Sequence, residues 1–311
     1  MSTICPHCAS KQTRKRGIRK RIYDTVQIYQ CKHCHLYFNE HIQKRTYPPA
    51  IIYTALQLYA QGHSLQATSA QVNARHRVTT SKSTICSWVH AYQHLTPLVN
   101  HRPEVLLQEK MVLSKRFTHE NLKYIYLLHY YKLHKLVQPH YPKLFTFLIR
   151  FEQGCPDVFF TIGQRCSNPP TKPYIPHSTK KHNLACSMAA FAVQAARKPY
   201  QRHEKVEAFL LMQDTATIAC EVPVWYWDKK LNDGITGHID VLQVRNNIVY
   251  IMDYKPEAKK QHTAAHQLYH YAVALSLRTQ IPLKKIRCAW FDEKEYYEFD
   301  PSKAKTKNRG M

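Results

Sequence analysis

Hydrophobic and polar positions follow a readable pattern from about residue 180 onward. Apolar residues recur every three or four positions in some segments, which predicts amphipathic helices, and every second position in others, which predicts strands. Short polar turns such as KKLNDG and RNN separate the strands. The predicted order is two helices, three antiparallel strands, one long helix and a further strand, at residues 182–198, 200–213, 217–227, 235–244, 248–256, 259–279 and 284–293.

A second pattern, of three short helices, lies in residues 47–95. Pro48 and Pro49 are suited to opening the first helix, and Gly62 to ending it. Ser64 is the expected cap of a second helix that runs through Val72, and a turn over residues 75–80 follows. Either Ser81 or Ser83 then caps a third helix that carries Ile85, Trp88, Val89 and Tyr92. This is the helix-turn-helix layout, in which the third helix enters the DNA groove.

Two Cys-x-x-Cys pairs flank a basic segment at the N-terminus. They are Cys5 with Cys8 and Cys31 with Cys34. Between them, a turn at Gly17 followed by alternating apolar residues predicts a β-hairpin (Ile22, Val26 and Ile28). Four thiolates arranged as two such pairs suit a tetrahedral Zn²⁺ ion, so we predict a structural zinc ribbon held by the four cysteines. A redox pair or unrelated reduced thiols is the alternative.

The remaining segments set the predicted domain boundaries. Residues 105–150 are rich in Tyr, Leu and His and are predicted to be a helical spacer, and a proline-rich connector follows at 166–178. We therefore expect a multidomain α+β protein whose last domain is a mixed-sheet α/β core flanked by helices. Its parts are a zinc ribbon (1–45), a helix-turn-helix domain (46–96), an unassigned helical connector (97–178) and an α/β core with a basic C-terminal tail (179–311).

Charge narrows the class of partner. The chain of 311 residues carries 45 Lys and Arg against 21 Asp and Glu, a formal net charge of +24. Such a balance favours a polyanion, and we expect DNA rather than a membrane, because no apolar run reaches the ~20 residues of a spanning helix. The absence of a secretory signal predicts an intracellular, cytoplasmic protein associated with DNA. In the ribbon, phosphate contacts are predicted for Arg14, Lys15, Arg16, Arg19, Lys20 and Arg21.

The order of ribbon and three-helix unit resembles the N-terminal DNA-binding region of insertion-sequence transposases, although the turn over residues 75–80 is longer than usual there. The resemblance implies that Lys82 and Ser83, at the start of the third helix, contact DNA. We predict that residues 1–95 choose the DNA site. A fragment from about residue 100 onward should then lose the sites and the affinity of the full chain. A transposase or recombinase partner, or a homodimer, would fit the same modules.

The strand over residues 248–256 ends in Asp253-Tyr254-Lys255, which places a carboxylate and an ammonium two positions apart on one face. Asp240 lies in the preceding strand, and Gln267 and Tyr271 share a face of the following helix because they are four apart. The sequence GHID…DYK…QLYHY, on this order of elements, resembles the RecB-like branch of the PD-(D/E)XK nuclease superfamily. The resemblance covers roughly residues 180–300.

The resemblance implies a Mg²⁺- or Mn²⁺-dependent deoxyribonuclease with a restriction-endonuclease-like core. Asp240 and Asp253 would hold the ion, with His203 and the Tyr254 carbonyl completing the protein's share. Lys255 would position the attacking water and offset transition-state charge, and Gln267 and Tyr271 would orient Lys255 or the substrate strand. Glu207 and Glu221 are rivals of His203 for the remaining metal position.

Several alternatives stay open. The sequence does not decide between endonuclease and exonuclease, or between roles in transposition, recombination and defence. A non-cleaving DNA-binding or transposition accessory protein that uses a nuclease-like scaffold is the competing class. Cys288 is the only cysteine after Cys220, so the iron–sulfur cluster of many RecB-like exonucleases is not expected. A histidine row at i, i+4 spacing is read as a polar helix face rather than a metal site (His262, His266 and His270).

Overall fold

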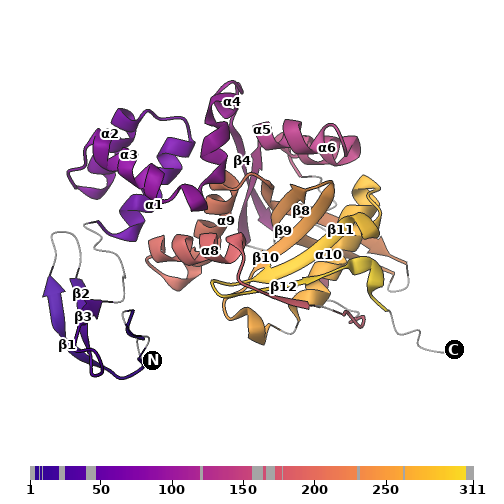
Figure 1. The fold of residues 1–311 in the computed structure, drawn as a ribbon. Coiled ribbons are helices and arrows are strands. Elements are labelled where there is room, and N and C mark those ends of the chain that lie inside the picture. Colours follow the sequence, from indigo (N-terminus) through magenta and orange to yellow (C-terminus); the bar gives the residue numbers. More distant parts are fainter. Residues whose placement is uncertain are drawn as a thin grey trace.

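Two β-sheets organise the chain, a small one near the N-terminus and a large mixed one that most of the helices cover (Figure 1). The structure is a computed structural model and describes residues 4–6, 8, 10–20, 25–39, 47–119, 122–155, 164–165, 172–176, 178–229, 232–261 and 263–305. Within these residues the chain is a mixed α/β protein, as the sequence predicted at that coarse level.

The small sheet has the strand order β1 (Thr13–Lys20), β2 (Thr25–Cys31), β3 (Tyr37–Asn39), with both pairs antiparallel. The prediction of a turn at Gly17 is wrong. Gly17 lies inside β1 with φ of 102°, at a shift of register between Lys15 and Ile18, and a bulge with this backbone angle favours glycine. Ile22, one of the predicted strand residues, falls outside the described residues.

Three helices follow, α1 (Pro49–Ala60), α2 (Leu65–His76) and α3 (Lys82–Ala91). The predicted signals operate at their ends: Pro49 lies in the first turn of α1, and the Ser64 side chain accepts a hydrogen bond from the Ala67 amide. Ser81 rather than Ser83 is the cap of α3, where it forms a reciprocal capping box with Thr84. The second helix runs four residues beyond the predicted end.

The prediction of a helical stretch over residues 105–150 is wrong for its first half. After the short helix α4 (Arg102–Leu106), the chain forms a hairpin of β4 (Val112–His119) and β5 (Leu122–His129). Aromatic and aliphatic residues follow one another from Tyr124 to Leu128 in β5, and this hairpin extends the large sheet by pairing with β8. Helical structure returns in α5 (Tyr130–Lys132) and α6 (Pro142–Ile149).

The large sheet has the strand order β4-β5-β8-β9-β10-β11-β12-β7, with the short β6 beside β9. Its central strands are β8 (Thr217–Asp228), β9 (Asp233–Arg245) and β10 (Ile248–Tyr254), and β9 pairs antiparallel with β8 on one side and β10 on the other. Beyond them, β11 (Ile286–Phe291) runs parallel to β10. Prediction from the sequence missed the short outer strands β6 (Gln164–Arg165), β7 (Ser178–Lys181) and β12 (Glu295–Phe299).

Helices cover both faces of this sheet, so the chain has three layers here. On one face, α10 (Ala264–Thr279) and α6 share a hydrophobic cluster with the strands. On the other face lie α8 (Leu184–Ala192) and α9 (Arg202–Gln213), and their cluster also takes in side chains of α1 and α3. The three-helix unit of α1, α2 and α3, which the sequence predicted to be a helix-turn-helix, therefore shares a core with the large sheet.

The contact between α1 and α9 is also hydrogen-bonded. Side chains on each helix reach backbone carbonyls of the other, and three such bonds are formed: Tyr53 Oη to Lys205 O at 3.1 Å, Gln57 Nε2 to Ala208 O at 3.0 Å, and Gln213 Nε2 to Leu56 O at 3.0 Å. Gln213 is fully buried. Bonds of this kind fix the rotation and register of α9 against α1.

Candidate metal centres

The four cysteines of the N-terminal segment converge as the sequence predicts. Their sulfur atoms lie within 4.8 Å of one another, with Cys5 Sγ 3.6 Å from Cys34 Sγ and Cys8 Sγ 3.6 Å from Cys31 Sγ. Four sulfurs at the Zn–S distance of a tetrahedral site would be about 3.8 Å apart. The group can therefore hold a structural ion such as Zn²⁺.

Backbone amides favour the metal-binding thiolate form of Cys31, whereas burial and the neighbouring thiols raise the pKa of Cys8 and of Cys34. The amides of Cys34 and His33 point at Cys31 Sγ from 3.5 and 3.4 Å. The Cys34 amide is the largest cause that lowers the pKa of the Cys31 thiol, to about 6. A thiol of this kind is deprotonated at neutral pH, which is the form that ligates a metal.

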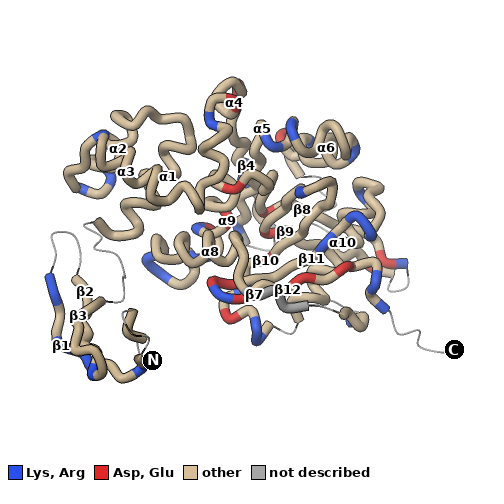
Figure 2. Tube along the Cα trace, viewed as in Figure 1, with Lys and Arg blue, Asp and Glu red and all other residues tan. Residues whose placement is uncertain are grey.

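The predicted basic residues of the ribbon are exposed along β1, which is blue over much of its length in Figure 2. Arg14 and Arg16 both donate to Gln30 Oε1, at 2.9 Å each, so two guanidinium groups are held side by side on β1. Lys15, Arg19 and Lys20 are exposed on the same strand, and Arg21 lies outside the described residues.

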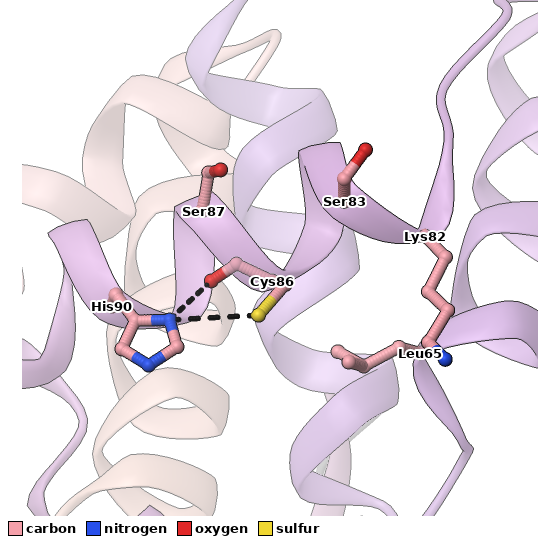
Figure 3. A pocket seen from close by; sticks show the side chains of 6 residues that line it. All are labelled: Leu65, Lys82, Ser83, Cys86, Ser87 and His90. Carbon is pink, nitrogen blue, oxygen red and sulfur yellow. Dashed lines mark hydrogen bonds between the residues drawn. The ribbon is translucent and has the colours of Figure 1, made fainter.

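The start of α3 borders a shallow groove of about 640 Å³ (Figure 3). Lys82 and Ser83, the residues expected to contact DNA, line it together with Leu65, Cys86, Ser87 and His90. In Figure 3 the hydroxyls of Ser83 and Ser87 point away from the body of the helix. Both residues named from the sequence are thus on the open face of α3.

A second group of metal-ligating side chains lies where α9 meets the central strands. His203, Asp240 and Asp253 each offer an atom within 4.8 Å of the others. His203 Nδ1 is 3.6 Å from Asp240 Oδ2, and Lys255 Nζ is 2.8 Å from Asp253 Oδ2. The structure therefore brings together three predicted ligands and the predicted lysine, on a helix and two strands far apart in sequence.

The strand register explains this convergence. Val241 of β9 pairs with Met252 of β10 on one side and with Cys220 of β8 on the other. The neighbouring position on each of these three strands is an acid: Asp240, Asp253 and Glu221. At Glu221 the backbone has φ of 51°, which is uncommon for a residue with a side chain and is a local strain. Cys220 and Val222, on either side of Glu221, contact opposite hydrophobic clusters.

Burial and mutual repulsion dominate the electrostatics of the group. Burial, reinforced by the charge of Asp240, raises the pKa of Asp253 well above its usual value. Burial and the charge of Asp253 raise the pKa of Glu221 to about 7. Glu207, one turn after His203 on α9, is buried, and its pKa is raised for the same reasons. Several carboxylates that lie this close together and away from water can all be ionised at the same time only if a cation lies among them.

Two more observations fit a cation at this place. Asp253 Oδ1 and Glu207 Oε1 are buried and have no hydrogen-bond partner in the described part of the chain. Burial lowers the pKa of His203, against the opposing charge of Asp253, so its ring is neutral and can offer a lone pair.

Burial acts to lower the pKa of Lys255, but Asp253 and Asp240 outweigh it and the pKa is raised. Lys255 is therefore protonated at neutral pH.

The remaining predicted residues are placed as follows. Gln267 Nε2 donates to Tyr271 Oη at 2.7 Å, so the two share one face of α10, as predicted. The Tyr254 ring packs edge-on against His203, and its hydroxyl donates to Glu293. Orientation of Lys255 by Gln267 and Tyr271, and ligation by the Tyr254 carbonyl, stay predictions.

His238 is a neighbour of the site that the sequence analysis did not single out. Its ring stacks on Tyr124 of β5 with centroids 3.6 Å apart, and Nδ1 lies 3.9 Å from Glu221 Oε2. His238 is two residues before Asp240, on the same face of β9, which was the available signal. Tyr124 carried no such signal, because the sequence analysis placed it in a helix.

Lys132 anchors the far end of α9. It is buried, and its Nζ donates to the carbonyls of Leu211 and Asp214, where α9 ends. Burial lowers the pKa of Lys132 to about 7, so its amine is only partly protonated at neutral pH. Its N–H groups satisfy the orphan carbonyls in either form, and the protonated form also complements the helix dipole. The residues after the β4–β5 hairpin thus hold the helix that carries His203 and Glu207.

Comparisons with known proteins identify no relative. No family model matches the chain, and neither the curated proteins nor the solved structures give a match. Among the described helices, none is both long and apolar enough to cross a bilayer.

Proposed function

We propose that this protein is a Mg²⁺- or Mn²⁺-dependent deoxyribonuclease that is directed to DNA by its ribbon and helix-turn-helix unit. The observation that carries the proposal is the convergence of His203, Asp240 and Asp253 within 4.8 Å, with Lys255 Nζ 2.8 Å from Asp253. The element order and the sequence GHID…DYK…QLYHY, which resemble the RecB-like nucleases, support the same reading.

In this proposal each side chain has a distinct role. Asp240 and Asp253 are hard oxygen ligands, and the neutral His203 adds a nitrogen. A bound divalent ion would lower the pKa of a water molecule and polarise the phosphate. Lys255, which is protonated and one quarter exposed, donates toward the phosphoryl oxygens as their charge grows. Glu221 and Glu207 are the acids placed to accept a proton from water or to complete the metal's ligands.

The basic N-terminal half supports DNA as the substrate. The paired guanidinium groups of Arg14 and Arg16 suit phosphate oxygens, which carry no sequence information. The groove beside Lys82 and Ser83 suits base edges. A site chosen by these elements and cut at the acidic cluster is the arrangement that we propose.

A cleavage assay on plasmid and single-stranded DNA tests the proposal. The full chain should cleave in Mg²⁺ or Mn²⁺, and cleavage should vanish in Asp240→Ala, Asp253→Ala and Lys255→Ala. DNA binding should persist in Lys255→Ala, because this change leaves the two carboxylates and the ribbon in place. Undiminished cleavage by Asp253→Ala would overturn the assigned site, and binding without any cleavage by the wild type would favour a DNA-binding scaffold.

A further inference from the structure

The acidic cluster is most open on the side of His203, whose side chain is 40% exposed, whereas Asp253 is completely buried. His203 lies in the first turn of α9, so the segment leading into α9 borders this opening. That segment, residues 197–202 with the sequence RKPYQR, is here called the α9 entry segment. It includes the short 3₁₀ turn Pro199–Gln201.

The α9 entry segment combines cations with an exposed ring. Arg197, Lys198 and Arg202 are exposed, and Tyr200 is 73% exposed. Lys198 Nζ lies 5.9 Å from the centroid of the Tyr200 ring. Glu204, the first acid after the segment, lies in the first turn of α9 and is exposed.

The backbone of the α9 entry segment is held in place. The side-chain oxygen of Gln201 accepts hydrogen bonds from the amides of Arg197 and Lys198, at 2.9 and 3.2 Å. Pro199, which follows Lys198, has its φ angle fixed by the proline ring. Because the backbone is already ordered, binding has to order only the side chains of the segment, which lowers the entropic cost of association.

This segment also links the acidic cluster to the helix-turn-helix unit. In Figure 2 the connection between α8 and α9 is blue and projects on the same side of the view as β1 and α2. Ala195, two residues before Arg197, belongs to the same hydrophobic cluster as Ile52 and Tyr53 of α1. Burial lowers the pKa of His76, at the end of α2, and the positive charge of Arg197 lowers it further. At its other end, Arg202 precedes His203 directly.

We propose that the α9 entry segment holds an unpaired stretch of the DNA strand beside the acidic cluster, with Tyr200 stacked on a base and Arg197, Lys198 and Arg202 on the flanking phosphates. An exposed ring can stack only on a base whose face is free, which an intact duplex does not offer, and cations beside such a ring follow the backbone. This inference rests on the proposed nuclease function, because it supplies the strand that the cluster would cut.

The test measures binding of a labelled single-stranded oligonucleotide of about 15 nucleotides to the full chain. An Asp253→Asn background prevents cleavage during the titration. Tyr200→Ser should weaken binding roughly 5- to 100-fold, whereas Tyr200→Phe, which keeps the ring, should bind like the parent. The control is Trp227→Ser, because Trp227 is 51% exposed and lies six residues, about 20 Å, beyond Glu221 on β8.

A photocrosslinking experiment separates this surface from the ribbon, which also attracts single strands. An oligonucleotide carrying 5-iodouracil should crosslink to Tyr200 on irradiation, with the site located by mass spectrometry. Affinity within twofold of the parent for Tyr200→Ser, an equal loss in Trp227→Ser, or crosslinks confined to residues 1–95 would each overturn the inference. Crosslinking at Tyr200 in a wild type that never cleaves DNA would retain the surface and reject the nuclease.

Discussion

Replacing Glu221 with Gln should stabilise the protein above neutral pH when no divalent ion is added. The pKa of Glu221 rises from 4.5 to about 7 on folding, because the side chain is buried and lies near Asp253. A carboxyl group with a raised pKa contributes stability that is fully present below its unfolded pKa and is lost as the pH rises through its folded pKa. Gln does not ionise, so the variant escapes this loss.

The size of the effect follows from the shift. About 2.5 pKa units at 1.36 kcal/mol each give about 3 kcal/mol. The Glu221 side chain keeps 21% of its surface exposed, and solvent screening reduces the figure. We therefore expect the difference in unfolding free energy between Glu221→Gln and the wild type to grow by about 1 to 3 kcal/mol from pH 4.5 to pH 8.

Urea unfolding followed by tryptophan fluorescence measures this difference. Trp225 and Trp290 are buried in the cluster between the sheet and α10, so they report on the relevant core. Glu257→Gln is the matched control, since Glu257 is 69% exposed and pairs with Lys260 on the surface. A pH-independent difference between Glu221→Gln and the wild type would refute the account of the acidic cluster. Added Mg²⁺ or Mn²⁺ should stabilise the wild type more than the variant if Glu221 is a ligand.

Other predictions follow from features elsewhere in the chain. Purified protein should contain about one Zn²⁺ per chain by elemental analysis, and Cys31→Ser should lose it. Gly62→Ala should lower the unfolding free energy by about 1 kcal/mol or more in urea denaturation, because φ is +97° and the added carbon would sit 2.6 Å from Leu106 Cδ2. Neutralising Arg16 and Arg19 should weaken binding to all DNA sequences similarly and flatten its salt dependence. Changing Lys82 should instead alter sequence preference more than affinity, as measured by competition with variant sites.

The sequence predicted those parts of the fold whose local signals agree with the final structure. Although β12 was missed, the seven helices and strands predicted after residue 180 have clear periodicity, and all are present with ends that differ from the prediction by at most six residues. The same holds for Ser64 as a helix cap, which acts through a contact only three residues away. The candidate ligands His203, Asp240 and Asp253 were named because a resemblance supplied the order in which separated residues meet, and the structure brings them within 4.8 Å of one another.

Other features depend on contacts that the sequence does not show. The residues of β5 were predicted to be helical, because tyrosine and leucine suit both structures and only pairing with β8 decides for a strand. The place of Glu221 beside Asp240 depends on strand register and on a backbone angle of 51°. The burial of Lys132 could not be predicted, because a lysine is buried only where another segment supplies hydrogen-bond acceptors, here the carbonyls at the end of α9.

The shared core of α1 and α9 has a consequence for anyone who would rearrange this chain. Tyr53, Leu56 and Ile52 of α1 belong to the same hydrophobic cluster as α8 and α9. A fragment that starts near residue 100 would expose that apolar face, and so would a chimera in which a foreign helix-turn-helix unit replaced residues 47–95. The unit is thus not an interchangeable cassette. New binding specificities should be sought by changing the open face of α3 while leaving the α1 surface, which packs against α9, intact.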